Sequence, residues 1–302
     1  MSEARHWAQM GLEEEAFEEL AARQPASAVW SLLLEVMERR AARRLPADLL
    51  RQWQRDGFTR PAPISQRTLV ELDGHLLDTA GGFEAVELSP VAPLGACSVV
   101  GLASQNKILS ALRGTEVVSD PTNVLALECA GRLREDSGQV VRLATSHRCV
   151  RAQALPKQPG FTQHFRMFCL ATAGREKRDH AFLVTALLEH VGTLRAALDR
   201  LEEHGYGFPH RRITVLATEE REALGDRVAR GLSGIEVERK VLEHPYYDGL
   251  RFMLWTRSSA GADIPLADGG AFDWLAKLAA NRKLVFVASG LGAQLAAGLF
   301  RR

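Results

Sequence analysis

The sequence predicts an α+β fold in which helices flank a mostly antiparallel sheet. Two β-like runs within residues 141–172 are joined directly by a loop that contains Pro and Gly, which is the pattern of a hairpin. Over the rest of the chain, strand-like and helical segments alternate without a regular repeat. A hairpin at the centre argues against a doubly wound parallel sheet, because parallel strands need crossover connections.

Length and composition narrow the class of protein. The chain has 302 residues, of which 46% are apolar and 25% charged, so a substantial core is expected. A net charge of +1 argues against nucleic acid as the main partner. The N-terminus lacks the apolar core of a signal peptide, and no apolar run approaches the ~20 residues that span a bilayer. We therefore expect a cytoplasmic protein with no membrane partner.

The cysteines are widely spaced and form no CxxC pair. Most of them lie in apolar or β-like runs, so we expect buried free thiols and no metal site. The residues concerned are Cys97, Cys129, Cys149 and Cys169.

Residues 1–60 are expected to form a helical N-terminal segment. Apolar residues recur there at helical spacing, and Pro25 and Pro46 divide the segment into about three short helices. A basic cluster follows the second stretch, and it has two interpretations: the solvated end of a helix, or a docking patch for an acidic partner or RNA. Its members are Arg39, Arg40, Arg43 and Arg44. A protein partner could therefore bind through these helices.

The core domain is expected to cover residues 61–302 after a Pro-rich linker. Ser65 is a suitable N-cap for a helix that ends near Gly81, and residues 83–88 alternate like a strand. A short strand at 115–118 and a helix at 123–133 precede the hairpin. The elements expected after the hairpin are a helix at 179–204, a strand at 212–217, a helix at 219–232, strands at 235–242 and 250–256, a Gly-rich turn at 268–270, a helix through 280, a strand at 284–288 and a helix that opens at 290–292.

The hairpin offers a site for an anion. Arg151 ends its first strand, and a guanidinium there suits the bidentate recognition of a carboxylate or phosphate. Arg166, on the second strand, is expected to face it across the loop. The alternative is a surface Arg in an ordinary hairpin. Asp120 or Glu128 could hold an ammonium group, although Asp120 before a Pro is equally suited to cap a helix.

A second group of candidates follows residue 243. Tyr246 and Tyr247 are expected on a strand, where successive side chains point to opposite faces, so only one of them should line a pocket. Gly249, Gly269 and Gly270 would permit close approach of the backbone to a ligand, or would simply form turns.

Four segments, taken in order, resemble the signature motifs of class II aminoacyl-tRNA synthetases. Residues 65–90 resemble motif 1, a helix and strand ending in Pro. SDPTNVLALE, which includes Asp120, Thr122 and Glu128, is similar to the loop and helix that read the amino group of the amino acid. HRCVRAQ and FTQHFRMF resemble motif 2, and residues 287–300 resemble motif 3. The order of the segments is more specific than any one of them.

Two further segments resemble the histidyl-tRNA synthetase branch and its regulatory relative in histidine biosynthesis. HPYYDGLRF (residues 244–252) is similar to the branch's histidine-binding Tyr-Tyr segment, and LADGGAFDWL (residues 266–275) is similar to its Gly-Gly-Arg-Tyr-Asp turn. The resemblance implies a homodimer with a pocket for an amino acid or an adenylate-like small molecule.

The departures from the family concern ATP. Motif 2 of the active synthetases has Glu two positions after its Arg, where this chain has Gln153. The motif 3 Arg is missing from residues 290–295, and the Gly-Gly turn continues with Ala271 in place of Arg. Such cations stabilise charge that develops on phosphate, and each is worth roughly 2–4 kcal/mol. We therefore expect at most a degenerate site for ATP and Mg²⁺.

Three functions remain open, and no catalytic residue is assigned. The preferred one is a stand-alone synthetase-like protein that binds an amino acid or nucleotide in a regulatory or accessory role, without tRNA charging, because no anticodon-binding domain is expected before Arg302. The second is a divergent ATP-dependent amino-acid ligase that acts on a carrier protein or small acceptor, with Arg151, Arg166 or Lys157 replacing the missing cation. The third is a structural subunit of a hetero-oligomer.

Overall fold

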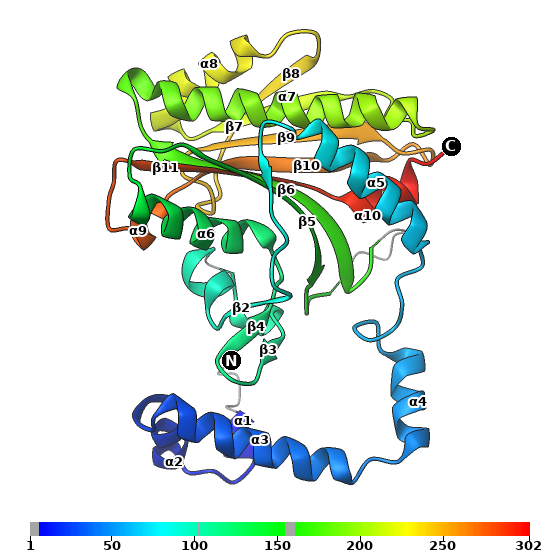
Figure 1. Cartoon of the computed structure of the whole chain (residues 1–302), viewed down its shortest axis with the longest axis vertical. Coiled ribbons are helices and arrows are strands. Elements are labelled where there is room, and N and C mark those ends of the chain that lie inside the picture. Colours follow the sequence, from blue (N-terminus) through cyan, green and yellow to red (C-terminus); the bar gives the residue numbers. More distant parts are fainter. Residues whose placement is uncertain (1–5, 102, 155–160) are drawn as a thin grey trace.

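The computed structural model describes residues 6–101, 103–154 and 161–302, and within them one large sheet organises the chain. Its strand order is β1-β5-β6-β11-β10-β9-β7-β8 (Figure 1). The strands are β1 (Glu84–Ala85), β5 (Val141–Val150), β6 (His164–Arg175), β7 (Arg212–Ala217), β8 (Glu236–Val241), β9 (Leu250–Arg257), β10 (Asp263–Phe272) and β11 (Leu284–Leu291). The predicted hairpin is the pair β5–β6, and the α+β class is confirmed.

The sheet is mixed, which corrects the expectation of a mostly antiparallel one. The inner neighbours from β5 to β7 pair antiparallel, but the outermost pair at each edge, β1–β5 and β7–β8, is parallel. In each parallel pair the chain between the strands contains a helix: α6 (Pro121–Glu135) in the first and α8 (Glu222–Gly231) in the second. Such helical crossovers make parallel pairing possible.

Helices cover both faces of the sheet. One face packs against α5 (Gln66–Thr79), α7 (Ala181–Glu203) and α10 (Ala293–Leu299), and the other against α6 and α9 (Trp274–Leu278) (Figure 1). Strand β6 shows the alternation: Phe168 and Leu170 belong to the core beneath α7, whereas Cys169 and Ala171 belong to the core beneath α6. The four cysteines are free and buried, as expected.

One described helix, counted from 178 to 203, is long and apolar enough to cross a membrane by length and composition alone. In its most apolar window, 56% of the residues are buried inside the protein. Leu187, Val191 and Leu194 lie on the face that packs against the sheet. The apolar character of α7 is therefore accounted for by its place in the core.

A small second sheet stands beside α6. It contains β2 (Val91–Pro93), β3 (Ser110–Ala111) and β4 (Thr115–Val117) in the order β2-β4-β3. Between β2 and β3 lie a short π-helix, η2 (Ala96–Val100), and a 3₁₀ turn, η3 (Gln105–Lys107). Glu116 is fully buried, and its carboxylate accepts hydrogen bonds from the N–H groups of Gly95 and Cys97 and from the Gln105 amide, at 2.8, 2.9 and 3.0 Å. It therefore fixes the start of η2 and the following loop.

The N-terminal helices stand apart from the sheet (Figure 1). They are α1 (His6–Gln9), α2 (Glu14–Glu18), the π-helix η1 (Glu19–Arg23), α3 (Ala26–Ala42) and α4 (Pro46–Arg55), so the chain breaks next to Pro25 and Pro46. The structure assigns no fully buried residue to any of these five helices. Their contacts with the core include Trp30 against Gly114, and the carbonyl of Arg60, just after α4, lies 2.6 Å from His164 Nε2.

The expected turn at residues 268–270 is wrong, because these residues lie inside β10. Gly269 pairs with Ser289 of β11 and Phe252 of β9. A Cβ added at Gly269 would lie 2.4 Å from the Ser289 Cβ, so the missing side chain allows close packing of the strands. The two glycines indicated a turn by composition, but here they serve a tightly packed strand.

Candidate functional site

A cavity of about 700 Å³ lies at the centre of the large sheet. Strands β6, β9, β10 and β11 contribute its floor, and its walls come from η2, the N-terminus of α6, the end of the hairpin and residues 244–247. The structure brings most of the sequence-predicted site residues together in this lining: Asp120, Thr122, Arg151, Gln153, Arg166, Tyr246, Tyr247 and Gly269.

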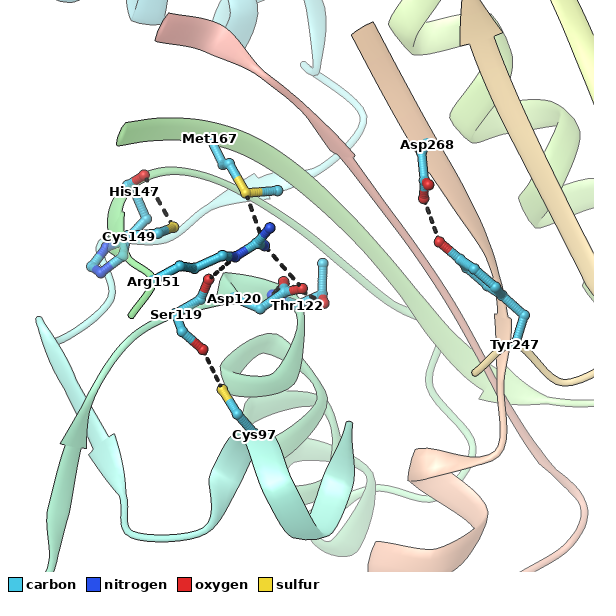
Figure 2. Close-up of polar contacts among 10 residues, drawn as sticks. All are labelled: Cys97, Ser119, Asp120, Thr122, His147, Cys149, Arg151, Met167, Tyr247 and Asp268. Carbon is cyan, nitrogen blue, oxygen red and sulfur yellow. Dashed lines mark hydrogen bonds and ion pairs between the residues drawn. The ribbon is translucent and has the colours of Figure 1, made fainter. Parts of the chain in front are cut away.

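Arg151 lines one side of the cavity, and Figure 2 shows the polar contacts that fix it. Its Nε donates to the carbonyl of Ser119 at 2.9 Å, and its Nη2 lies 3.6 Å from a carboxylate oxygen of Asp120. The guanidinium also stacks on Phe165, with 5.1 Å to the ring centroid. Among the described residues, its Nη1 has no hydrogen-bond partner. The guanidinium is thus oriented in advance, with one N–H edge left for an anion.

Asp120 has two tasks at the N-terminus of α6. As the N-cap, it accepts hydrogen bonds from the Thr122 N–H at 3.0 Å and the Thr122 hydroxyl at 2.7 Å. Its second oxygen faces Arg151. Next to it, Asn123 is 2% exposed and lines the cavity, and its Oδ1 has no partner among the described residues. A buried acceptor without a donor is a place where a ligand N–H or O–H would bind.

Tyr246 and Tyr247 both line the cavity, which corrects the expectation that only one of them would. They lie in a turn before β9, where the strand rule of alternating faces does not apply. The Tyr247 hydroxyl donates to one oxygen of Asp268, and Arg251 donates to the other. Burial raises the pKa of both tyrosines above the ordinary value, so both hydroxyls stay protonated donors.

The Tyr247–Asp268 pair lies apart from the Arg151 group (Figure 2). Between β10 and the turn, an aromatic cluster backs the tyrosines: Phe272 and Trp274 have ring centroids 3.9 Å apart, and Tyr246 meets both edge-on. The cavity therefore has a cationic end at Arg151, an aromatic wall, and a polar end made by Tyr247, Asp268 and Arg251. Such a layout suits a small polar ligand.

Two of the predicted glycines have structural tasks outside the cavity lining. A Cβ at Gly270 would lie 2.6 Å from a ring atom of Tyr247, so this glycine makes room for the ring. Gly249 has a φ of +73° and precedes β9 in a turn. Glu128 also lies outside the lining, because it pairs with Arg132 at 2.8 Å on the exposed side of α6.

Arg166 does not face Arg151, which corrects that expectation. It lies opposite Arg148 in the hairpin register, between Phe165 and Met167, the two residues of β6 that contact Arg151. Because strand side chains alternate, Arg166 points to the α5 side, where it pairs with Asp73 at 2.9 Å. Its charge is therefore matched by Asp73, although its side chain still lines part of the cavity.

The segment that resembles motif 3 holds a closed polar network. Gln294 of α10 is 3% exposed, donates to the Thr162 hydroxyl at 2.9 Å and accepts from Arg148 at 3.5 Å. Arg148 also lies 2.9 Å from His164 Nδ1. Among the described residues, no group of three or more His, Cys, Asp and Glu side chains gathers to hold a metal ion.

Sequence reasoning missed several lining residues. Asp268 and Arg251 stand inside segments that resembled family motifs, but the assumed turn and strand hid their pairing. Asn123 looked like one more residue of an apolar helix. Nothing in the sequence around Lys107 indicated a site residue. Lys107 is exposed at the cavity, and its carbonyl accepts from the Ala152 N–H at 2.8 Å. No described carboxylate pairs with its side chain. Lys157, another predicted cation, lies outside the described residues.

Solved structures that superpose on this chain share its fold. The ATP phosphoribosyltransferase regulatory subunit/histidyl-tRNA synthetase of Bacillus halodurans superposes with a TM-score of 0.63 at 13% identity, over 80% of this chain and 81% of that one. The fold is that of the class II aminoacyl-tRNA synthetases. Two further solved structures, both of histidine–tRNA ligases, superpose on this chain and support the assignment of the class II synthetase-like fold.

The first is a histidine–tRNA ligase subunit of Alicyclobacillus acidocaldarius, with a TM-score of 0.58 at 15% identity over 80% of this chain and 96% of that one. The second is the apo histidyl-tRNA synthetase of S. aureus, with a TM-score of 0.57 at 13% identity over 80% and 68%. No protein-family model and no curated protein matches the sequence. The resemblance to the class II synthetase-like fold is therefore one of structure.

Proposed function

We propose that this protein is a synthetase-like accessory or regulatory protein of the cytoplasm that binds an amino acid, or an adenylate-like derivative of one, and does not charge tRNA. The observation that carries the proposal is the oriented guanidinium of Arg151. Ser119, Asp120 and Phe165 hold it beside the cavity and leave an N–H edge open. A ligand carboxylate or acyl-phosphate oxygen would bind there.

The rest of the cavity lining supports the choice of ligand. An α-ammonium would find acceptors in Asp120 and in the open Oδ1 of Asn123. A polar side chain would reach the Tyr247–Asp268–Arg251 group, which offers a hydroxyl and a carboxylate. Both ends of a zwitterion are therefore matched within one cavity.

ATP and Mg²⁺ fit the site poorly. The arginines that line the cavity already have carboxylate partners: Arg151 has Asp120 at 3.6 Å, Arg166 has Asp73, and Arg251 has Asp268. Gln294 stands in the segment where the family carries its motif 3 Arg, and its amide is used by Thr162 and Arg148. A triphosphate would meet few free positive charges here, and we derive no step through it.

Calorimetric titration tests the proposal. The wild-type chain is titrated with the standard amino acids, with ATP and with non-hydrolysable aminoacyl-adenylate analogues. Because hydrogen bonds to charged groups contribute roughly 1.5–3 kcal/mol, Arg151→Met should weaken binding about 10- to 100-fold. Arg67→Met, at an exposed position of α5, is the matched control and should bind like wild type. Absence of binding by the wild type, or equal binding by Arg151→Met, contradicts the proposal.

A divergent ligase is the second candidate, and Lys107 is the observation in its favour. Among the residues that the structure describes, this lysine lines the cavity without a carboxylate partner, and its carbonyl accepts from the N–H of Ala152 at the hairpin exit. Amino-acid-dependent exchange of pyrophosphate into ATP measures the activity directly. Exchange that Lys107→Met abolishes would establish the ligase, whereas none with any amino acid would remove it.

A structural role in a hetero-oligomer is the third candidate. It rests on the similarity to a protein named as an ATP phosphoribosyltransferase regulatory subunit. Tagged full-length chain, recovered from its own cells, should then retain a phosphoribosyltransferase or synthetase partner at fixed stoichiometry. Recovery without such a partner, together with amino-acid binding, would favour the first candidate.

A further inference from the structure

The N-terminal arm, which we define as α1 to α4 with η1, exposes an unusual share of apolar side chains. On α3 they form a stripe, the α3 stripe, at spacings of one, three and four residues, which places them on one side of the helix. Its members are Leu32, Leu33, Val36 and Met37, with exposed fractions of 46%, 39%, 41% and 50%. Exposed apolar clusters of this kind mark interaction surfaces.

Charge on the arm is divided between its two ends. Before α3 lies an acidic run, in which Glu13, Glu15 and Glu18 have no ion-pair partner among the described residues. At the end of α3 lies a basic run, in which Arg40 and Arg43 likewise have none. Arg40 follows Val36 by four residues and Leu33 by seven, so it lies on the same side of the helix as the α3 stripe.

The two runs are too far apart to satisfy each other within one chain. Helix α3 has 17 residues, which corresponds to a length of about 25 Å. At physiological ionic strength the Debye length is about 8 Å, so attraction between the ends of one arm is screened. In Figure 1, α2 lies on the side of the arm from which α3 begins, and α4 follows the other end.

We propose that the α3 stripe is the contact between two copies of this chain, with the two α3 helices antiparallel. A two-fold axis near the middle of α3 places the acidic run of each copy against the basic run of the other. The same axis brings the two α3 stripes together and removes them from water. A parallel pair would instead oppose like charges at both ends.

The other occupants fit the charge pattern less well. An anionic membrane surface would attract the basic run but repel Glu13, Glu15 and Glu18 in the same arm. A purely acidic protein would meet the same obstacle. The acidic and basic runs of the arm are both matched only by a partner that carries a basic run opposite the first and an acidic run opposite the second. A second, antiparallel copy of the arm has that arrangement.

Disulfide trapping in the full chain tests the antiparallel contact. The native cysteines are all buried, so an introduced exposed thiol reports its own neighbourhood. Leu33→Cys, near the middle of α3, should form disulfide-linked dimers alone. Ala26→Cys, seven residues before Leu33, should link to Arg40→Cys, seven residues after it, when differently tagged variants are mixed, at least tenfold more than either variant links to itself. Glu38→Cys, on the opposite side of α3, is the matched control and should link at least tenfold less than Leu33→Cys.

Charge reversal provides a second measurement that does not depend on an introduced thiol. Arg40→Glu with Arg43→Glu should weaken self-association at least tenfold in sedimentation velocity at low salt, and adding Glu15→Arg and Glu18→Arg should restore it. If the core domains also dimerise through a separate contact, the charge reversal should convert a tetramer into a dimer. The proposal would be overturned by disulfide links between like ends, by no links at all, or by unchanged self-association of the charge-reversed variant. If the wild-type chain then sedimented with anionic lipid vesicles, the α3 stripe would be assigned to a membrane.

Discussion

His190 should make the stability of this protein fall between neutral and mildly acidic pH. The imidazole is fully buried between α7 and the sheet, with Nε2 2.9 Å from the Thr172 hydroxyl and Nδ1 2.9 Å from the Ser289 hydroxyl. Burial lowers its pKa from 6.5 to about 3. Because Ser289 lines the cavity, this histidine also supports the floor of the proposed site.

The sign and the size follow from proton linkage. Below pH 6.5 the unfolded chain binds a proton at His190 while the folded chain does not, so acid favours unfolding until the pH reaches about 3. A pKa difference of one unit is worth about 1.4 kcal/mol, so lowering the pH from 7 to 5 should remove about 2 kcal/mol through this residue alone.

Urea unfolding of the wild type and of His190→Gln, at pH 7 and at pH 5, measures this term. Gln keeps a donor and an acceptor but does not titrate, so the variant should lose about 2 kcal/mol less than the wild type over that interval. His210→Gln, at an exposed position, is the control and should keep the wild-type loss. Equal losses for wild type and His190→Gln would refute the neutral, buried state of His190.

Three further predictions concern packing, charge and thiols. Gly269→Ala should lower the free energy of unfolding by about 1–3 kcal/mol, because its Cβ would lie 2.7 Å from the Ala288 carbonyl oxygen. Gly131→Ala, in an open part of α6, should raise the free energy of unfolding by about 0.5–1 kcal/mol. Urea unfolding measures both. Arg166→Met should cost about 2 kcal/mol at pH 7 and less near pH 4, where Asp73, whose pKa burial raises, takes up a proton; an equal cost at both pH values would contradict the ion pair. A thiol reagent should modify all four cysteines only after unfolding, since burial raises the pKa of Cys129 to about 12.

The sequence was sufficient to predict the α+β class, the central hairpin and the place of Arg151. These follow from local pattern: two β-like runs joined directly by a loop are expected to pair with each other, and Arg151 follows the end of the first run. The position of Asp120 was also predictable, since Asp-Pro-Thr before an apolar helix is a capping pattern whatever the tertiary fold.

Side-chain direction was not predictable in the same way. Arg166 and Arg151 point to different sides because the hairpin register pairs Arg166 with Arg148, and the loop length alone does not set that register. The Tyr pair lies in a turn because β9 begins only at Leu250. A shift of a few residues in a strand boundary thus changed which side chains meet in the cavity.

The parallel edge formed by β7 and β8 has a signature in the sequence. Residues 212–242 contain a strand, a helix and a second strand in direct succession, which is the pattern of a crossover unit. The hairpin itself lies in the interior of the sheet, between β1 and β11. A mixed sheet results when a hairpin core is extended at its edges by such units.

The network around Gln294 indicates that one substitution would not introduce a free cation into the segment that resembles motif 3. Gln294 is buried, and Arg148 lies 3.5 Å from its carbonyl oxygen while the Thr162 hydroxyl accepts from its amide nitrogen. An Arg at this position would place two guanidinium groups against each other in a poorly solvated space, where like charges are costly. Restoring a cation for ATP would require removing Arg148 as well, and Arg148 also lies beside His164, which contacts the carbonyl of Arg60 in the segment that leads to the arm. The polar network at Gln294 and the attachment of the N-terminal arm are therefore linked through the same few side chains.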